Sequence, residues 1–446
     1  MVSRYTFKNG LRIVYEKPIS ILPVTSVQVF CDYGSVYETD DVRGAAHFIE
    51  HMCFKGTSKI PDAKDIFLNY NKIGAYFNAE TDKRYTRYYV LCEDDYVKNS
   101  IHILSDMLMN STFNKKQFQK EENVVIEENI RSRDSASSDI NNTINNIIYK
   151  GSSYENPVDD ITYHQGKRFH YEDIVEIYKM FYIPSRMVVS VVSNLSFSTI
   201  KEMINESFFS KQSKKLAIDL NTYEKYQKKI SYIPYDKIQY SINKKKELST
   251  MHVNIGIRIC NYYSPDTYPL ILLCDIIGGN TSGRLYNLLR ENNGLTYSSG
   301  TETVFYEHLG DLTFFIQTDP NKLIHNGDKK GVLPLVIQLI NDLIKKGITS
   351  EELKTIKSNF KGRFALNLQY NDNFAFRNGL DELMGLEKIV PVRDAYEKFY
   401  ENITVKDVNR MIKKYFKKEN ITVCIIANKA PSLETVKNEC EKIIEK

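Results

Sequence analysis

The sequence is poor in the features that mark secreted, disulfide-stabilised and membrane-spanning proteins. Its 446 residues hold seven cysteines, an odd number, which are scattered and form no C-x-x-C pair. This usage predicts free thiols in a reducing compartment, with neither a disulfide framework nor a cysteine zinc site. No stretch provides about 18 unbroken apolar residues, so we expect no membrane span and no membrane partner.

The N-terminal stretch M-V-S-R-Y-T-F-K-N-G-L-R-I-V-Y also lacks the apolar core of a signal peptide. That core needs ~7–15 apolar residues, whereas here polar and apolar residues alternate around an N-G turn. We interpret the stretch as the first hairpin of the fold. A cytoplasmic location is expected, or an organelle matrix in a eukaryote.

Neither sign of charge is in excess. The chain has 60 lysines and arginines against 56 aspartates and glutamates, a formal net charge of +4. Lysine clusters such as residues 211–215 and 413–418 are therefore interpreted as solvated helix faces and loops, and no nucleic-acid partner is expected. With 42% hydrophobic and 26% charged residues, the composition is typical of a globular protein.

The chain is too long for one hydrophobic core, and its second half repeats the pattern of the first. At 446 residues it suits two domains of roughly 200 residues each. Val24–Phe30 and Val253–Ile259 both alternate as half-buried strands do. Each half later has a helix that leads into a buried strand, at Ile174–Phe181 and Met187–Val192, and at Val408–Phe416 and Ile421–Ala427. The pattern predicts an α+β fold of two tandem homologous α/β-roll domains.

A polar segment separates the two copies. Residues Leu216–Leu248 are rich in Lys, Tyr, Asn and Asp and low in apolar content. We interpret this segment as a linker and divide the chain into an N-terminal domain, residues 1–228, and a C-terminal domain, residues 229–446.

Histidine is scarce, yet two of the eight histidines lie four residues apart in H-F-I-E-H. On a helix opened by Gly44, His47 and His51 lie on one face, so both imidazoles reach one ion, with Glu50 beside it. Two imidazoles and an adjacent carboxylate are typical of a hydrolytic zinc site, where the carboxylate takes the proton of a water. The alternative is a chance register, expected in roughly one such chain in a hundred.

The second half of the sequence indicates that the histidine pair is not needed for folding. At the equivalent place it has L-L-C-D-I-I-G-G, without a histidine. The scaffold is duplicated and the histidines are not, which favours a role in chemistry.

A zinc site of this kind needs a third protein ligand. The helix-forming stretch Q-K-E-E-N-V-V-I-E-E-N-I-R offers Glu121, Glu122, Glu127 and Glu128, with Glu121 and Glu128 two turns apart on one face. Four glutamates on a helix are more often a solvated face. Spacing alone does not select which of them approaches the histidines.

Several motifs together resemble the inverzincin peptidases of the pitrilysin and mitochondrial-processing-peptidase family. They are H-F-I-E-H with M-C-F-K-G-T, D-Y-G-S-V-Y-E, G-A-Y-F-N-A-E-T, E-E-N-V-V-I-E-E, F-Y-I-P-S-R-M and S-G-R-L-Y-N-L-L-R-E-N-N-G-L-T-Y. The resemblance covers nearly the whole chain. It implies that His47, His51 and Glu128 bind Zn²⁺, with Glu127 as the rival by one residue.

The same resemblance implies further roles. Glu50 is the expected general base, and Glu121 is expected to orient a ligand or the base. Alternation around Tyr76, Asn78 and Glu80 looks like an edge strand, although an ordinary internal strand fits equally well. Family members bind peptides by adding them to this strand, so Phe54, Asn78, Ala79 and Glu80 are expected to bind substrate.

In the second half, Arg290 ends a helical run closed by Gly294, and Tyr297 begins the next strand. The resemblance implies that this Arg–Tyr pair holds the substrate carbonyl and the developing oxyanion. In short family members each chain is half of a clamshell, and the pair faces the partner chain's metal site. A homodimer is therefore expected, with a sister subunit as the alternative.

Two segments depart from the family's patterns. Processing peptidases that cut beside an arginine have acidic residues at set places after the third ligand, but in R-S-R-D-S-A-S-S-D-I, which follows Glu128, the aspartates stand at other places. G-G-N-T-S-G is too short for the glycine-rich loop of the non-catalytic subunits. The predicted function is a zinc-dependent endopeptidase or oligopeptidase that acts on unfolded peptides in a closed chamber. The alternatives are an inactive core-type structural subunit and a processing-peptidase subunit that needs a sister chain.

Overall fold

The computed structural model describes residues 1–159, 169–211 and 229–444. They form two compact units. The first contains Met1–Ile130, Asn156–Lys229 and Phe364–Ala395, and the second contains Arg131–Glu155, Ile230–Arg363 and Tyr396–Lys446.

The first unit is built on a six-stranded sheet with the order β1-β2-β6-β3-β5-β4. Its strands are β1 (Val2–Thr6), β2 (Arg12–Glu16), β3 (Val24–Cys31), β4 (Tyr76–Thr81), β5 (Thr86–Glu93) and β6 (Met187–Val192). β1 and β2 pair as the hairpin predicted from the N-terminal alternation, and Gly10 turns it with a φ of +90°. β4 is an edge strand that pairs with β5 and with no other described strand.

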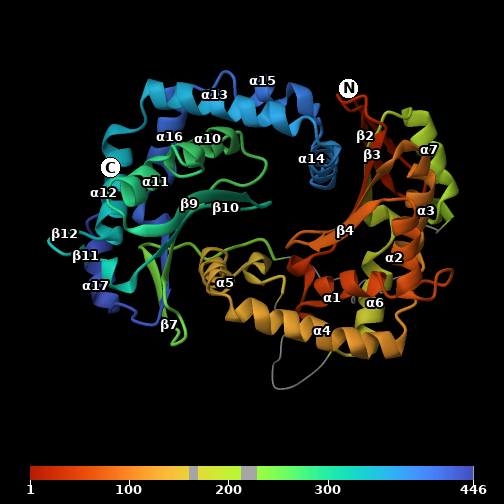
Figure 1. The fold of residues 1–446 in the computed structure, drawn as a ribbon, viewed down its shortest axis with the longest axis horizontal. Helices are drawn as coiled ribbons and strands as arrows, with labels where there is room; N and C mark the ends of the chain where they lie inside the picture. The colour runs from red at the N-terminus through yellow and green to blue at the C-terminus, as the bar shows by residue number, and fades with distance from the viewer. Residues whose placement is uncertain (160–168, 212–228, 445–446) are drawn as a thin grey trace. The chain divides into compact units, whose positions relative to one another are not determined.

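Helices cover both faces of this sheet. They are α1 (Ala45–Cys53), α2 (Ala63–Lys72), α3 (Val97–Met109), α4 (Lys115–Asp134), α6 (Tyr171–Phe181), α7 (Phe197–Glu206), α8 (Phe208–Lys211) and α14 (Asn371–Leu383). The strands lie between α14 and α3 (Figure 1), and α1 packs against β4 and β5. The predicted helix for H-F-I-E-H is thus confirmed as α1.

The second unit contains a five-stranded sheet with the order β7-β13-β8-β10-β9. Its strands are β7 (Gln239–Lys244), β8 (Met251–Ile259), β9 (Thr296–Phe305), β10 (Gly310–Thr318) and β13 (Ile421–Ala427), and a separate short ribbon is formed by β11 (His325–Asn326) and β12 (Lys329–Lys330). Its helices are α5 (Ala136–Ile148), α10 (Thr267–Ile277), α11 (Arg284–Tyr286), η6 (Asn287–Glu291), α12 (Val332–Lys346), α13 (Ser350–Asn367), α15 (Ala395–Phe399), α16 (Val405–Tyr415) and α17 (Leu433–Cys440). Limits of the two units fall within α4, α13 and α15, so these three helices are divided between the units.

The two sheets confirm the duplication. The order β2-β6-β3-β5-β4 in the first matches β7-β13-β8-β10-β9 in the second, and in each the first two strands are the parallel pair. α10 follows β8 as α1 follows β3, so L-L-C-D-I-I-G-G does stand where the first copy has its histidines. The fold is α+β, as predicted.

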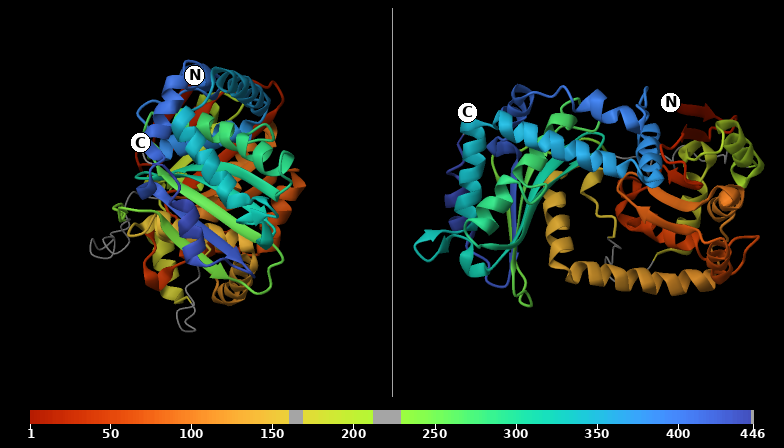
Figure 2. Two further views of the ribbon diagram at one scale, coloured as in Figure 1. Left: turned by 90° about the vertical axis from the view of Figure 1, so that its left-hand side faces the viewer. Right: turned by 45° about the horizontal axis from the view of Figure 1, so that its top comes forward.

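The units differ from the contiguous domains 1–228 and 229–446 because the copies exchange one helix each. α14, from the second half of the sequence, packs on β3 and β6, and α5, from the first half, packs on β8 and β13 (Figure 2). Glycines allow both close approaches: a Cβ on Gly379 would lie 2.1 Å from the Phe30 ring, and one on Gly256 would lie 2.5 Å from Ile148 Cδ1.

The predicted linker Leu216–Leu248 needs a correction. Residues 216–228 lie outside the described residues, but Gln239–Lys244 forms β7 and pairs in parallel with β13. The low apolar content misled the prediction, because β7 is an edge strand without a fully buried residue.

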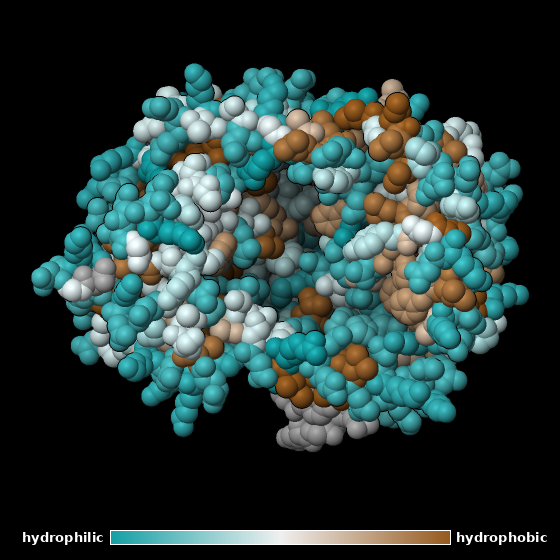
Figure 3. All heavy atoms as spheres, in the orientation of Figure 1, coloured by the Kyte–Doolittle hydropathy of each residue, from teal (hydrophilic) through white to brown (hydrophobic). Residues whose placement is uncertain are grey.

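The described residues contain no helix that is both long enough and apolar enough to cross a membrane. Hydrophilic residues cover most of the surface that faces the viewer in Figure 3.

Candidate metal centre

Helix α1 begins at a carboxylate that binds its free backbone amides. Glu38, 6% exposed, accepts hydrogen bonds from the amides of Gly44 at 2.8 Å and Ala46 at 2.7 Å. Gly44 takes a φ of +83° at the N-cap, where no side chain of the helix itself caps the amides. An acid at a helix N-terminus satisfies orphan donors and interacts favourably with the helix dipole. Glu38 therefore fixes where the histidine helix starts.

The helix divides into a buried face and a face that carries the histidines. Phe48, Ile49 and Met52 are fully buried, whereas His47 and His51 remain partly exposed. The Phe48 ring packs edge-on against Phe118 of α4 at a centroid distance of 4.7 Å. This contact places α4 beside α1, so that its glutamates approach the histidines.

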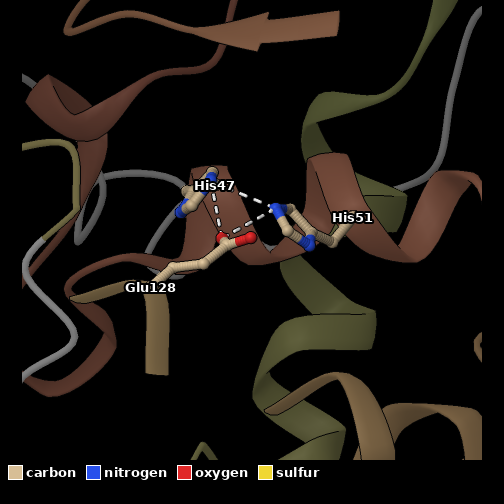
Figure 4. A group of neighbouring side chains, drawn as sticks. All are labelled: His47, His51 and Glu128. Carbon is tan, nitrogen blue, oxygen red and sulfur yellow. Dashed lines mark hydrogen bonds and ion pairs between the residues drawn. The ribbon is translucent and has the colours of Figure 1, made fainter. Parts of the chain in front are cut away.

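Three donor atoms converge on one point (Figure 4). His47 Nε2 and His51 Nε2 are 3.1 Å apart, and Glu128 Oε2 lies 3.9 Å from the first and 3.5 Å from the second. Tetrahedral zinc with bonds of about 2.0–2.2 Å separates neighbouring donors by roughly 3.3–3.6 Å. The two nitrogens and one oxygen therefore fit a zinc ion.

The other glutamates of α4 point elsewhere. Glu127 is exposed, and Glu122 accepts a hydrogen bond from the amide of Phe169 at 2.9 Å. Of the four candidates it is Glu128 that the structure brings to the histidines, and Glu121 lies behind them. The ligand roles themselves stay a prediction.

Glu121 contacts the far side of His51. Its Oε1 lies 2.8 Å from His51 Nδ1, and its Oε2 lies 2.7 Å from Lys55 Nζ. A carboxylate on one ring nitrogen sets the tautomer that presents the other nitrogen to a metal. This position agrees with the orienting role predicted for Glu121.

Glu50 lies beside the donor cluster and is held by a strand residue. Its Oε2 accepts a hydrogen bond from the Thr81 hydroxyl at 2.5 Å, at the end of β4. Burial raises the pKa of Glu50, and this effect outweighs the Thr81 hydrogen bond and the charge of His51, which lower it. A carboxylate with a raised pKa is a better proton acceptor near neutral pH.

The two histidines differ in their electrostatic surroundings. Burial and the neighbouring His51 lower the pKa of His47 to about 4, so this imidazole is neutral and has one unprotonated ring nitrogen at physiological pH. Burial also lowers the pKa of His51, but the Glu121 hydrogen bond and the nearby carboxylates raise it more, and the net shift is upward.

The predicted substrate-binding residues lie on or below the open edge of the first sheet. Asn78 is exposed on β4, and its Oδ1 accepts a hydrogen bond from the Ala79 amide at 2.9 Å. Glu80 pairs with Arg87 at 2.9 Å. Phe54 lies in an aromatic cluster with Phe67, Phe77 and Tyr88, with centroids 6.0–6.4 Å away, and so supports β4 from beneath.

Arg290 and Tyr297 lie together in the second unit. The Arg290 guanidinium donates to the backbone carbonyl of Tyr297 at 2.8 Å, and the Tyr297 side chain is 66% exposed. Gly294, with a φ of +58°, closes the helical run that carries Arg290, as predicted. The pair is therefore formed, while its role on a substrate stays a prediction.

Sequence reasoning assigned no role to Glu38, Thr81 or Lys55. All three stand inside motifs that carried the resemblance, D-Y-G-S-V-Y-E, G-A-Y-F-N-A-E-T and M-C-F-K-G-T. Glu38 lies too far before the N-cap Gly44 for a capping pattern to identify it, because a capping box places its acid three residues after the N-cap. Nothing local indicates that Thr81 reaches Glu50 or that Lys55 reaches Glu121, because both contacts depend on tertiary packing.

A buried helix with two histidines, a carboxylate from a second helix and an acid beside them define a metallopeptidase-like centre, and comparison with known proteins agrees. Residues 20–160 match the family model "Insulinase (Peptidase family M16)", and residues 168–360 match "Peptidase M16 inactive domain". The chain is 32% identical to the uncharacterized zinc protease YmxG of Bacillus subtilis over 86% of its own length and 88% of that protein. The chain therefore belongs to the insulinase family of peptidases, family M16.

Other relatives extend the comparison. The beta subunit of the mitochondrial-processing peptidase of Dictyostelium discoideum is 29% identical over 62% of this chain and 57% of that protein. Among solved structures, a protease from Helicobacter pylori has a TM-score of 0.84 at 21% identity and covers 96% of this chain and 99% of its own. The first half of the periplasmic protease PqqL from Escherichia coli has a TM-score of 0.78 at 16% identity, over 100% of this chain and 97% of that one. These structures share the fold.

Proposed function

We propose that the chain is a zinc-dependent endopeptidase or oligopeptidase that hydrolyses unfolded peptides. One observation carries the proposal: His47, His51 and Glu128 offer three donors within 4.8 Å of one another, next to Glu50 on the same helix as the histidines. The relatives named zinc proteases support the choice of metal.

His47, His51 and Glu128 would hold the ion. When bound, zinc supplies Lewis acidity, which acidifies a water and polarises a carbonyl group. The neutral His47 and the His51 tautomer set by Glu121 both suit this ligation.

Glu50 moves the proton in this proposal. Thr81 occupies its Oε2, so Oε1 is the oxygen expected to take the proton of the attacking water and to return it to the leaving amine. The same hydrogen bond ties the base to β4, the strand along which the substrate is proposed to lie. The base and the peptide are therefore positioned by one element.

The peptide is proposed to bind by strand addition to β4. Among the described residues β4 pairs with β5 alone, so its other edge offers backbone groups to an added strand. Backbone pairing tolerates many side chains, so we expect a broad sequence preference.

The alternatives to this function are an inactive core-type subunit and a subunit that requires a sister chain. An inactive core-type subunit has no need of a complete donor set, whereas here all three donors and the base are in place. A subunit that requires a sister chain is favoured by the relationship to a protein named as a beta subunit.

We propose a homodimer, because one chain carries both the metal motif and the Arg290–Tyr297 pair. A closed chamber and a cytoplasmic location remain part of this proposal.

A peptide-hydrolysis assay tests the function. We expect the purified chain to cleave an unfolded fluorogenic peptide of ~10–20 residues at an internal peptide bond. This activity should be lost with a chelator and regained when zinc is added back. Cleavage that persists in the chelator-treated, metal-free chain would refute a zinc mechanism. A chain that binds zinc but cleaves no peptide alone or as a homodimer would favour the sister-subunit alternative.

A further inference from the structure

The residue two positions after helix α1 reaches back to the metal centre. Lys55 Nζ lies 2.7 Å from Glu121 Oε2, and the Lys55 side chain is 25% exposed while that of Glu121 is only 8% exposed. The other Glu121 oxygen, Oε1, contacts His51 Nδ1 at 2.8 Å. Glu121 is therefore held at both oxygens, by the lysine on one side and the histidine on the other.

The loop that carries Lys55 is built to keep it in place. The Lys55 amide donates to the Met52 carbonyl at 3.0 Å. Gly56 follows with a φ of +123°, and a Cβ there would lie 2.3 Å from the Pro61 carbonyl oxygen, so only glycine makes this turn.

Thr57 anchors the other side of the turn. It is fully buried, its hydroxyl donates to Asp106 of α3, and the same oxygen accepts the Ile60 amide at 2.8 Å. The stretch F-K-G-T is thus anchored on both sides of Gly56. This anchoring fixes the direction of the Lys55 side chain.

We propose that Lys55 is a positioning residue, which locks the Glu121 carboxylate in the orientation that aims His51 Nε2 at the metal. This inference rests on the proposed function. A carboxylate bonded at one oxygen can rotate about its Cγ–Cδ bond, whereas a carboxylate bonded at both oxygens cannot. Groups that orient a metal-binding histidine typically change metal affinity or activity by about 10–100-fold when removed.

The test compares zinc affinity in matched variants by competition with a chromogenic chelator. Lys55→Met keeps the length of the side chain and removes the ammonium, and we expect it to weaken zinc binding about tenfold. Lys55→Arg restores a donor to Glu121 and should recover most of the affinity. Lys59→Met is the control, because Lys59 lies in the same loop, is exposed and forms no ion pair with a described residue.

A double-mutant cycle identifies the route of the effect. If Lys55 acts through Glu121, then Lys55→Met should change zinc affinity less than about twofold when Glu121→Gln is already present. The metal-free Lys55→Met chain should stay folded, with a single cooperative thermal unfolding transition. Unchanged zinc affinity in Lys55→Met, an equal loss in Lys59→Met, or additive losses in the cycle would each overturn the inference. Failure of the parent chain to bind zinc would overturn the proposed function as well.

Discussion

At the scale of single residues, Glu50 differs from the three donor residues in the partner that its side chain contacts. Its Oε2 is bound by Thr81, whereas the donor atoms of His47, His51 and Glu128 face one another. The ligand set and the base are therefore separable by substitution.

Glu50→Gln is expected to keep zinc and to lower peptide cleavage by about 10²–10⁴-fold, because only the proton acceptor is lost. Glutamine retains an oxygen for the Thr81 hydroxyl, so the fold should be unaffected. Zinc content and cleavage rate are measured on the same preparation. Loss of zinc from a folded Glu50→Gln chain would make Glu50 a ligand and the role assignment wrong.

Glu128 and Glu127 provide a matched pair for the third ligand. Glu128→Gln should weaken zinc binding at least about tenfold more than Glu127→Gln, because a directly bound carboxylate contributes both charge and coordination. Glu127 is exposed, away from the donor cluster, and its substitution is the control. The reverse order, in a chelator competition, would move the third ligand by one position.

Sequence reasoning reached the histidines and Glu50 from their spacing on a helix, because that contact is local. Glu128 was selected over Glu127 by resemblance and not by spacing, since the choice depends on how α4 packs against α1 through Phe48 and Phe118. Lys55 and Thr81 were missed for the same reason. Each acts on a residue far away in the sequence, to which no local pattern connects it.

At the scale of helices and strands, the exchange of α5 and α14 is the feature that sequence reasoning did not predict. Periodicity indicates that a helix has an apolar face but not which sheet covers it. The helix α1 and the strand β4 followed from motif spacing and alternation, whereas the strand order was not predicted and alternation left the edge or internal position of β4 open. The edge strand β7 was assigned to the linker, because a strand without buried residues looks like a polar loop.

Gly379→Ala tests the packing of α14 on the first sheet. The added methyl would lie 2.1 Å from the ring of Phe30, which is fully buried. We expect a loss of about 1–3 kcal/mol in the free energy of unfolding, measured with urea.

Gly362→Ala on α13 is the control for this substitution, because a Cβ there meets nothing within 4 Å. It should leave stability unchanged or raise it by about 0.5–1 kcal/mol through helix propensity. Equal effects of the two substitutions would show that α14 does not pack closely on β3 in solution.

At the scale of the whole molecule, the Arg290–Tyr297 pair and the metal centre belong to different units of the chain. If the pair of one chain acts on the metal site of its partner, a Glu50→Gln chain and an Arg290→Ala chain are each inactive alone and active when mixed. About half of the dimers are then mixed, and each holds one intact site of two, so recovery should approach roughly a quarter of the parent activity.

This complementation is measured with differently tagged chains, so that subunit exchange is shown independently by co-purification. Metal-free thermal unfolding of Arg290→Ala controls for the loss of its hydrogen bond to the Tyr297 carbonyl. Exchange without recovery would contradict a shared site and leave a same-chain pair or a sister subunit.

The most direct test of the central claim is the zinc content of the purified chain, measured by elemental analysis after removal of loosely bound metal. The structure places a single group of three converging donors, His47, His51 and Glu128, among its described residues. We predict close to one zinc ion per chain, falling to well below half in a folded His51→Gln variant. A metal-free parent chain that remains metal-free after incubation with zinc would contradict the account.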